Sequence, residues 1–285
     1  MAQSNEAPVL SGIPQGSVLG PILFTLFIND LPDSVTSLCK IFADDTKLYN
    51  LSTSHHIMQD DINNLIKWSN RWLLHFNADK CKVMHFGCKN LSHEYTMDIN
   101  NRNMPISKCV HEKDLGVIFD NRLKFDEHIQ AAISKANKML GIIRRAFAFM
   151  DKEIFLHLYK SLVRPHLEYG NSIWCPHLKR QSSAIEKVQR RATKMITVYK
   201  NLTYKERLAI LKLPSLKYRR LRGDLIQTYK IISGIDNISP QHFFKFCDFT
   251  KTRNSACKIF IKQSRITSVN LVLVIAWHVN GINYH

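Results

Sequence analysis

The chain has 285 residues, an apolar content of 45% and a formal net charge of +17. With only 10 glycines and 9 prolines, this composition excludes a disordered chain and provides a core for one large or two small domains. The seven scattered cysteines include no Cys-x-x-Cys pair, which argues against a disulfide framework or a zinc site. No signal peptide is apparent, and the apolar run at 271–277 is too short to span a bilayer. We therefore expect an intracellular protein without membrane association, in either the nucleus or the cytoplasm.

The charge is distributed unevenly along the chain. Residues 1–134 hold 12 Lys/Arg against 15 Asp/Glu, whereas residues 135–225 hold 21 against 6 and residues 226–285 hold 7 against 2. The basic middle segment is a candidate surface for binding phosphates. The alternative is a set of solvated helix faces.

The first elements combine a turn, a helix and a hairpin. A glycine–proline turn, Gly12-Ile-Pro-Gln-Gly16, precedes apolar residues that recur every three or four positions from Ser17, which predicts a helix with Pro21 in its first turn. Residues 37–49 then predict a strand, a tight turn and a second strand. This hairpin places Asp44 and Asp45 at its tip.

Further elements favour an α+β fold followed by helices. An amphipathic helix runs from Ile57 toward Phe76, and strands are predicted at 82–86 and 115–119, so we expect helices on an antiparallel sheet. After Asn121 the apolar spacing predicts five helices. Paired arginines are expected on their outer faces: Arg144, Arg145, Arg190, Arg191, Arg219 and Arg220. We predict domains at 1–122 and 123–250 and a degenerate tail at 251–285.

The adjacent carboxylates are a candidate metal site. Neighbouring side chains of a regular strand point to opposite faces, so only a tight turn lets both Asp44 and Asp45 approach one cluster of ions. Mg²⁺ takes hard oxygen ligands and keeps several waters, so a few carboxylates suffice. The alternative is a solvated Asp-Asp turn. The apolar strands on both sides and the upstream glycine–proline turn favour the metal site.

The glycine–proline turn and the Asp-Asp hairpin together resemble consecutive motifs of reverse transcriptases from non-LTR (LINE-type, jockey- or CR1-like) retrotransposons. The matching residues are Gly12-Ile-Pro-Gln-Gly16 and Phe42-Ala-Asp-Asp45, in this order and at this spacing. The later region is similar to the segment that follows the catalytic motifs in the same proteins. Its landmarks are Leu115–Asp120, Arg164-Pro165, Glu168-Tyr-Gly170 and Trp174.

The resemblance implies a fold and a reaction. The fold is a partial polymerase palm, built of antiparallel hairpins with helices, followed by an all-α thumb-like domain. The reaction is two-metal nucleotidyl transfer with Mg²⁺ or Mn²⁺, in which Asp44 and Asp45 are the catalytic ligands. The partners are an RNA template, an RNA–DNA hybrid whose backbone the paired arginines contact, and dNTP. The nucleotide- and template-binding residues implied are Gly12, Pro14, Gln15, Gly16, Ala43 and Lys80.

Three hypotheses stay open at this point. Reverse transcriptases similar to this chain carry a third catalytic Asp upstream of the Gly-x-Pro-Gln-Gly turn, and none of the eleven residues before Gly12 is Asp. We therefore expect a polymerase fragment that is inactive alone and needs a palm strand from a longer chain. The alternatives are a non-catalytic nucleic-acid-binding remnant and a decayed reading frame that does not fold stably. Lys80 has its own alternative, a solvated lysine at a helix end.

Overall fold

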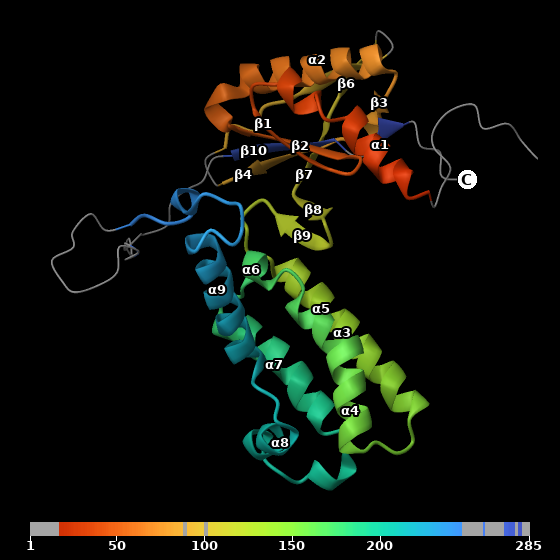
Figure 1. Ribbon diagram of the computed structural model, residues 1–285, viewed down its shortest axis with the longest axis vertical. Helices are drawn as coiled ribbons and strands as arrows, with labels where there is room; N and C mark the ends of the chain where they lie inside the picture. Colours follow the sequence, from red (N-terminus) through yellow and green to blue (C-terminus); the bar gives the residue numbers. More distant parts are fainter. Residues whose placement is uncertain are drawn as a thin grey trace, which may run out of the picture. The chain divides into compact units, whose positions relative to one another are not determined.

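The computed structural model describes residues 17–87, 90–99, 102–246, 259, 271–276 and 279–280, and the chain divides into two compact units. The first unit joins Met1–Glu112 to Thr267–His285, and the second is Lys113–Ile266 (Figure 1). The predicted boundary after residue 122 lies ten residues later than this division. Of the predicted tail at 251–285, the part from Thr267 onward belongs to the first unit and the part before it to the second.

The first unit begins with the predicted helix and hairpin, and both predictions are confirmed. Apolar residues spaced three or four positions apart form α1, and the two-residue turn at Ala43–Asp44 joins β1 to β2. The amphipathic segment forms α2, which ends at Leu73 in the left-handed conformation, and the predicted strand at 82–86 is present. The elements are α1 (Leu19–Phe27), η1 (Leu31–Ser34), β1 (Leu38–Phe42), β2 (Asp45–Leu51), η2 (Ser52–Ser54), α2 (His55–Trp72), β3 (His75–Phe76), η3 (Ala78–Lys80) and β4 (Lys82–Phe86).

A five-stranded sheet organises this unit, with the strand order β1-β2-β10-β4-β7. β10 (Leu271–Ala276) comes from the segment predicted to be degenerate, yet it lies in the centre and pairs antiparallel with both β2 and β4 (Figure 1). β7 (Ser107–Cys109) runs parallel to β4 at the other edge. Two small antiparallel sheets complete the unit. They pair β5 (Thr96–Ile99) with β6 (Arg102–Pro105) and β3 with β11 (Val279–Asn280).

Helix α2 lies along one face of the sheet and supplies five of the fifteen buried residues in the core of the first unit (Figure 1). Its buried residues Met58, Ile62 and Leu65 belong to the same apolar cluster as Leu48 of β2 and Val83 of β4. Burial of these side chains is the main stabilising contribution to the unit, at about 1.5–3 kcal/mol for each large apolar side chain. Both strands are therefore fastened to the same helix.

A buried carboxylate fixes the segment that leads into the hairpin. Asp61 of α2 is 1% exposed and accepts hydrogen bonds from the backbone N–H groups of Thr36 and Ser37, both at 2.8 Å. The Thr36 hydroxyl donates to the same carboxylate at 3.1 Å. A buried charge is tolerated because charge-assisted hydrogen bonds satisfy it. Asp61 thus sets the position at which β1 begins.

The second unit is mainly helical, as predicted. The strand expected at 115–119 starts two residues late, because Leu115 and Gly116 form a turn with φ of +43° and +85°. Trp174, Tyr159 and Ile185 lie in one apolar core, each 1% exposed or less. The elements are β8 (His111–Asp114), which spans the division, β9 (Val117–Asp120), α3 (Asp126–Ala146), α4 (Lys152–Leu158), the π-helical η4 (Tyr159–Val163), α5 (Arg164–Glu168), α6 (Asn171–Trp174), α7 (Lys179–Thr193), η5 (Thr197–Tyr199), α8 (Tyr204–Leu211), α9 (Leu216–Ile232) and η6 (Pro240–His242).

Candidate functional site

The two adjacent acids lie at the tip of the β1–β2 hairpin, where the sequence places them. Ala43 and Asp44 form the turn, and Phe42 and Asp45 are opposite each other in the register of the two strands. Ala43 has φ of +51°, a left-handed conformation that costs a non-glycine residue roughly 1–3 kcal/mol. Asp44 and Asp45 are both half-buried. The turn therefore sets two neighbouring carboxylates at one end of the sheet at a cost in backbone strain.

Lysines from two strands occupy the same end of the sheet. Ile275 of β10 is opposite both Lys47 of β2 and Lys82 of β4, so β2 and β4 run in the same direction and these lysines are level. Because adjacent strands are about 4.8 Å apart, their Cα atoms are separated by roughly 10 Å across β10. The residues that precede Lys82, including Lys80, consequently lie at the same end as the Asp44–Asp45 turn.

Lys47 was missed by sequence reasoning. It is two positions after Asp45 on the same strand, so strand alternation places both on one face of the sheet. Only 5% of Lys47 is exposed, which is rare for lysine. The available signal was this spacing, a lysine at the second position after the acidic pair.

The other two lysines differ in their surroundings. Lys82 donates a hydrogen bond to a Glu112 carboxylate oxygen at 2.7 Å, and this contact raises the pKa of the Lys82 ammonium. Lys80 ends the short η3 turn and is exposed. Lys82 is therefore engaged with Glu112, whereas Lys80 presents its charge to solvent.

The predicted nucleotide-binding turn cannot be placed in this geometry. Gly12, Pro14, Gln15 and Gly16 lie outside the described residues. The described part of the chain begins at Ser17, whose hydroxyl oxygen accepts a hydrogen bond from the Gly20 N–H at 3.0 Å and so satisfies one N–H at the start of α1. The helix that follows the turn is confirmed, and none of its residues is buried.

The donor set at the hairpin tip contains two carboxylates. Within the described part of the chain, no group of three or more His, Cys, Asp or Glu residues is arranged to hold a metal ion. Two carboxylate donors are compatible with an ion that retains waters or takes ligands from a bound phosphate. They do not form the closed cage of a structural zinc site.

Four of the six predicted arginines lie on the surface of the second unit. Arg144 and Arg145 are exposed in the last turn of α3, and Arg190 and Arg191 are exposed in the last turn of α7. Arg191 Nη1 donates to Asn137 Oδ1 at 2.7 Å, which ties α7 to α3. The Arg190 guanidinium carbon is 4.9 Å from the centroid of the Tyr204 ring.

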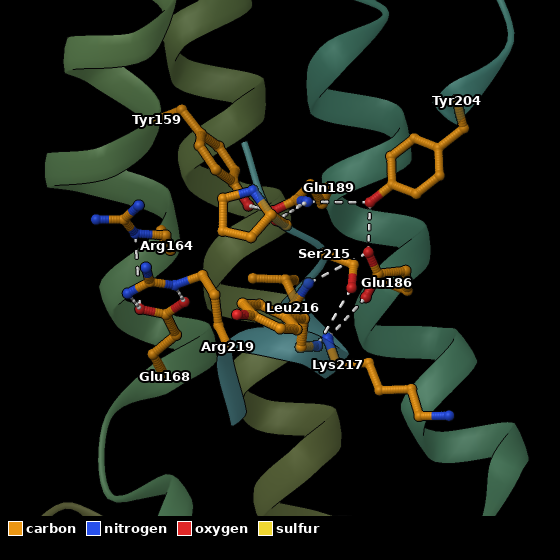
Figure 2. Close-up of polar contacts among 12 residues, drawn as sticks. Tyr159, Arg164, Glu168, Glu186, Gln189, Tyr204, Ser215, Leu216, Lys217 and Arg219 are labelled. Atoms are coloured by element: carbon orange, nitrogen blue, oxygen red, sulfur yellow. Dashed lines mark hydrogen bonds and ion pairs between the residues drawn. The ribbon is translucent and has the colours of Figure 1, made fainter. Parts of the chain in front are cut away.

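The remaining two arginines belong to the packing of α9. Arg219 forms two hydrogen bonds with the Glu168 carboxylate, which also lies 3.6 Å from Arg164 Nε (Figure 2). Arg220 is 4% exposed, donates to Ser182 Oγ at 3.0 Å, and has its pKa lowered by burial. The expected outer-face location is wrong for Arg220. It lies four residues after the buried Leu216, so both side chains are on the inward face of the helix.

Polar side chains of α7 hold the start of α9 in place (Figure 2). The Glu186 carboxylate accepts the backbone N–H groups of Leu216 and Lys217 at 3.3 and 3.2 Å, and it also accepts the Tyr204 hydroxyl. A carboxylate is favourable here because it meets the partial positive charge of a helix N-terminus. Glu186 therefore stabilises the packing of α7 against α9.

Gln189 connects three segments in the interior of the same unit. It is 1% exposed, accepts a hydrogen bond from the Tyr159 hydroxyl, and donates to Tyr204 Oη at 3.0 Å and to the Pro214 carbonyl at 3.1 Å. Burial is the main cause that raises the pKa of Tyr159, so its hydroxyl stays protonated and requires an acceptor. This network stabilises the helical fold.

Comparison with known proteins identifies the class. Residues 2–143, which contain the hairpin and most of its sheet, match the family described as "Reverse transcriptase (RNA-dependent DNA polymerase)". The chain belongs to the reverse transcriptase family. This agrees with the motifs at residues 12–16 and 42–45.

The curated relatives narrow the class to retrotransposons of the non-LTR, LINE type. The chain is 30% identical over 216 residues to "Probable RNA-directed DNA polymerase from transposon X-element" of Drosophila melanogaster, a match that covers 69% of this chain and 23% of the relative. It is 30% identical over 202 residues to the corresponding protein of transposon BS (66% and 22%) and 28% identical over 213 residues to that of mobile element jockey (68% and 23%), both from Drosophila melanogaster.

The extent of these matches is limited in two ways. The chain spans about a quarter of the length of the curated relatives it matches. No solved structure matches it.

Among the described residues, every helix is too short or too polar to cross a lipid bilayer.

Proposed function

We propose that this chain supplies the later palm and the thumb of an RNA-directed DNA polymerase from a non-LTR retrotransposon. The first unit corresponds to the palm and the second, helical unit to the thumb. The observation that carries the proposal is the strained turn that holds Asp44 and Asp45 together at the end of a sheet, within the segment that matches the reverse transcriptase family.

The donor chemistry at the turn fits Mg²⁺ or Mn²⁺. Asp44 and Asp45 would hold the ions through carboxylate oxygens, with Asp44 as the principal ligand. Divalent ions bound there would stabilise the negative charge of the triphosphate and of the attacking 3′-hydroxyl. The strained Ala43 keeps the two carboxylates adjacent before any ion binds, so less reorganisation is needed.

Other groups at this end of the sheet position the substrates. Lys47 and Lys80 add positive charge beside the turn, which would attract the triphosphate of a dNTP. Gly12 to Gly16 would line the slot where the nucleotide meets the template. Glycine there lets the backbone approach a base or sugar closely.

The exposed arginine pairs of the second unit would hold an RNA–DNA hybrid. Arg144 and Arg145 on α3 and Arg190 and Arg191 on α7 are exposed in a segment with 21 basic against 6 acidic residues. Contacts of this kind bind phosphates without reading sequence. This charge also supports a second candidate function, a non-catalytic protein that binds nucleic acid through the helical unit alone.

Metal binding at the turn is tested with isosteric variants. We expect Asp44→Asn and Asp45→Asn each to weaken Mn²⁺ binding at least tenfold, measured by electron paramagnetic resonance titration. Asp60→Asn is a matched control, because Asp60 is exposed on α2 and its replacement removes the same charge. Equal affinity in all three variants would contradict a metal site at the turn.

Primer extension on an RNA template tests the polymerase step with the same proteins. We expect no DNA synthesis by the wild-type chain alone. Synthesis by the wild-type chain would contradict the expectation of an inactive fragment, and synthesis that also survives in Asp44→Asn would contradict the catalytic role of the turn, whatever its metal affinity.

Binding to the hybrid separates the two candidate functions. We expect the double variant Arg190→Gln/Arg191→Gln to bind an RNA–DNA hybrid more weakly, with a salt dependence shallower by roughly 0.7–0.9 in slope for each phosphate that the variant no longer neutralises. Arg102→Gln, exposed on β6 of the first unit, is the control. Tight hybrid binding together with loss of Mn²⁺ binding only in the turn variants supports the polymerase. Hybrid binding without any metal site supports the second candidate.

A further inference from the structure

The central position of the five-stranded sheet is filled by a strand from a distant part of the chain. β10 starts at Leu271, which is 220 residues after Leu51, the last residue of β2. β2 and β4 each pair with β10 and do not pair with each other (Figure 1). Without β10 these strands would therefore face each other across an open position one strand wide.

The two walls of this position are held by elements other than β10. β2 is joined to β1 by the Ala43–Asp44 turn, and β4 pairs with β7 on its other side. Leu48 of β2 and Val83 of β4 both pack in the cluster beneath α2, and each is 1% exposed or less. Two strand steps of about 4.8 Å separate the walls, and the helix core fixes that spacing.

β10 is held in this position by main-chain pairing on both sides. Its six residues are in register with Thr46–Leu51 of β2, and five of them are also in register with Lys82–Phe86 of β4. Main-chain hydrogen bonds give strand addition its affinity and depend little on sequence. Proline is excluded because a central strand uses every N–H. The position therefore accepts an extended segment of about six residues without proline, as Leu271–Ala276 is.

We propose that the position between β2 and β4 is an exchangeable strand-acceptor site, in which residues 271–276 of a second copy of this chain can replace the chain's own β10. A second copy is the best-matched occupant, because its strand has the same length, sequence and register as the strand already seated. Exchange of one identical element between copies adds no new contacts and needs no other partner. This inference does not depend on the polymerase proposal, and its tests measure strand binding alone.

The first test opens the site in the full-length chain. Leu273 is opposite Tyr49 and Met84, so Leu273→Pro removes an N–H from a central strand and prevents β10 from pairing. A fluorescent peptide of residues 270–279 should then bind the variant at least tenfold more tightly than the wild-type chain, whose site is filled. The matched control is the same peptide with proline in place of Leu273, which should not bind. Equal binding of both peptides, or equal binding to both chains, would overturn the proposal.

The second test keeps both full-length chains able to fold. Tyr49 and Leu273 are opposite each other in adjacent strands, where Cα atoms are about 4.5–5.5 Å apart, a separation that permits a disulfide. After a Tyr49→Cys chain is mixed with a Leu273→Cys chain, exchange predicts a disulfide-linked dimer that contains one of each, identified by peptide mapping. A chain with Asp60→Cys replaces the Tyr49→Cys chain as the control. Absence of a disulfide between the two introduced cysteines, or an equally abundant disulfide in the control, would contradict exchange.

Discussion

The hairpin tip of the first unit and the helix packing of the second unit use carboxylates in different ways. In the first unit, Asp44 and Asp45 lie at a strained turn at the end of the sheet that also carries Lys47 and Lys82. In the second unit, Glu168 and Glu186 both accept hydrogen bonds from α9. Glu168 accepts from the Arg219 side chain, and Glu186 accepts from backbone N–H groups at the start of the helix. Glu168 and Glu186 therefore stabilise helix packing, whereas Asp44 and Asp45 are adjacent, half-buried carboxylates at one end of the sheet.

The arginine pairs show the same difference within one unit. Arg190-Arg191 and Arg219-Arg220 are identical dipeptides, yet the first pair is exposed and the second is engaged in packing. Their helices decide this, because Arg220 follows the buried Leu216 by four residues whereas Arg190 and Arg191 extend from the outer face of α7. A charged motif thus has a functional meaning only after its face of the helix is known.

Among the substitutions that test the difference between the two units, Asp61→Ala in the first unit should lower the free energy of unfolding most. The change removes the acceptor of two backbone N–H groups and the Thr36 hydroxyl, and these donors would be left without a partner near the core. At about 1–3 kcal/mol for each unsatisfied group, we expect the free energy of unfolding to fall by about 3–4 kcal/mol. Urea denaturation measures this, with amide hydrogen exchange to locate the loss.

Asp60→Ala is the matched control for Asp61→Ala. Asp60 is adjacent in sequence but exposed, so its replacement should change the free energy of unfolding by less than about 0.5 kcal/mol. If Asp61→Ala accelerated exchange equally in α3 and α7, the separation into two units with separate cores would be contradicted.

Gln189→Leu in the second unit should have the next largest effect and lower the free energy of unfolding by about 2 kcal/mol. Leucine fills a similar volume but leaves the Tyr159 hydroxyl and the Pro214 carbonyl without their partner. Lys187→Leu, exposed on the same helix, is the control and should be nearly neutral. Thermal and urea unfolding measure the difference. Equal stability of the two variants would show that the Gln189 network does not hold the helical unit.

Much of the first unit could be predicted from local pattern. The amphipathic α2 and the strand at 82–86 follow from apolar patterns that are buried in the structure, and the hairpin at 37–49 follows from its tight turn. The helix after Ser17 also follows from apolar spacing, although none of its residues is buried. The position of Asp44 and Asp45 could be predicted for the same reason. Their motif lies in a two-residue turn whose flanking strands pair in full register.

The remainder depends on contacts between segments far apart in sequence. The apolar run at 271–276 has no periodicity that separates a strand from a degenerate tail, and its assignment requires the open position between β2 and β4. The burial of Arg220 likewise depends on which face of α9 meets α7. Lys47 became a site candidate only when the register placed it level with Lys82. Local propensity cannot supply this information.

Glu168→Gln should lower the free energy of unfolding by a smaller amount, about 1 kcal/mol. The carboxylate makes a bidentate pair with Arg219 and raises the pKa of that guanidinium, but both side chains are partly exposed, so solvent screens the interaction. Glu153→Gln, exposed on α4, is the control. Because salt screens exposed charges, the difference between the two variants should shrink as NaCl is raised from about 0.05 to about 1 M. A salt-independent loss would instead indicate that the hydrogen-bond geometry alone stabilises the pair.

The smallest expected effect is on the pH dependence of the free energy of unfolding, through protonation of His128. This side chain is buried beside Trp174, and its Nδ1 accepts the Ile118 N–H at 3.2 Å. Burial, with a smaller contribution from Lys135, lowers its pKa in the folded chain below the unfolded value of about 6.5. As the pH falls through this window the unfolded chain takes up a proton that the folded chain does not, so the free energy of unfolding decreases.

A variant separates the contribution of His128 to this pH dependence from the contributions of other groups. His128→Asn keeps a side-chain oxygen as an acceptor for the Ile118 N–H but cannot be protonated, so it should flatten the decline in stability as the pH falls below about 6.5. His157→Asn, exposed on α4, should leave the decline unchanged. His85 of the first unit also has its pKa lowered by burial, so a residual decline in His128→Asn should map to amides of the sheet. A residual decline that maps to the helices would mean that another group in the second unit controls its acid sensitivity.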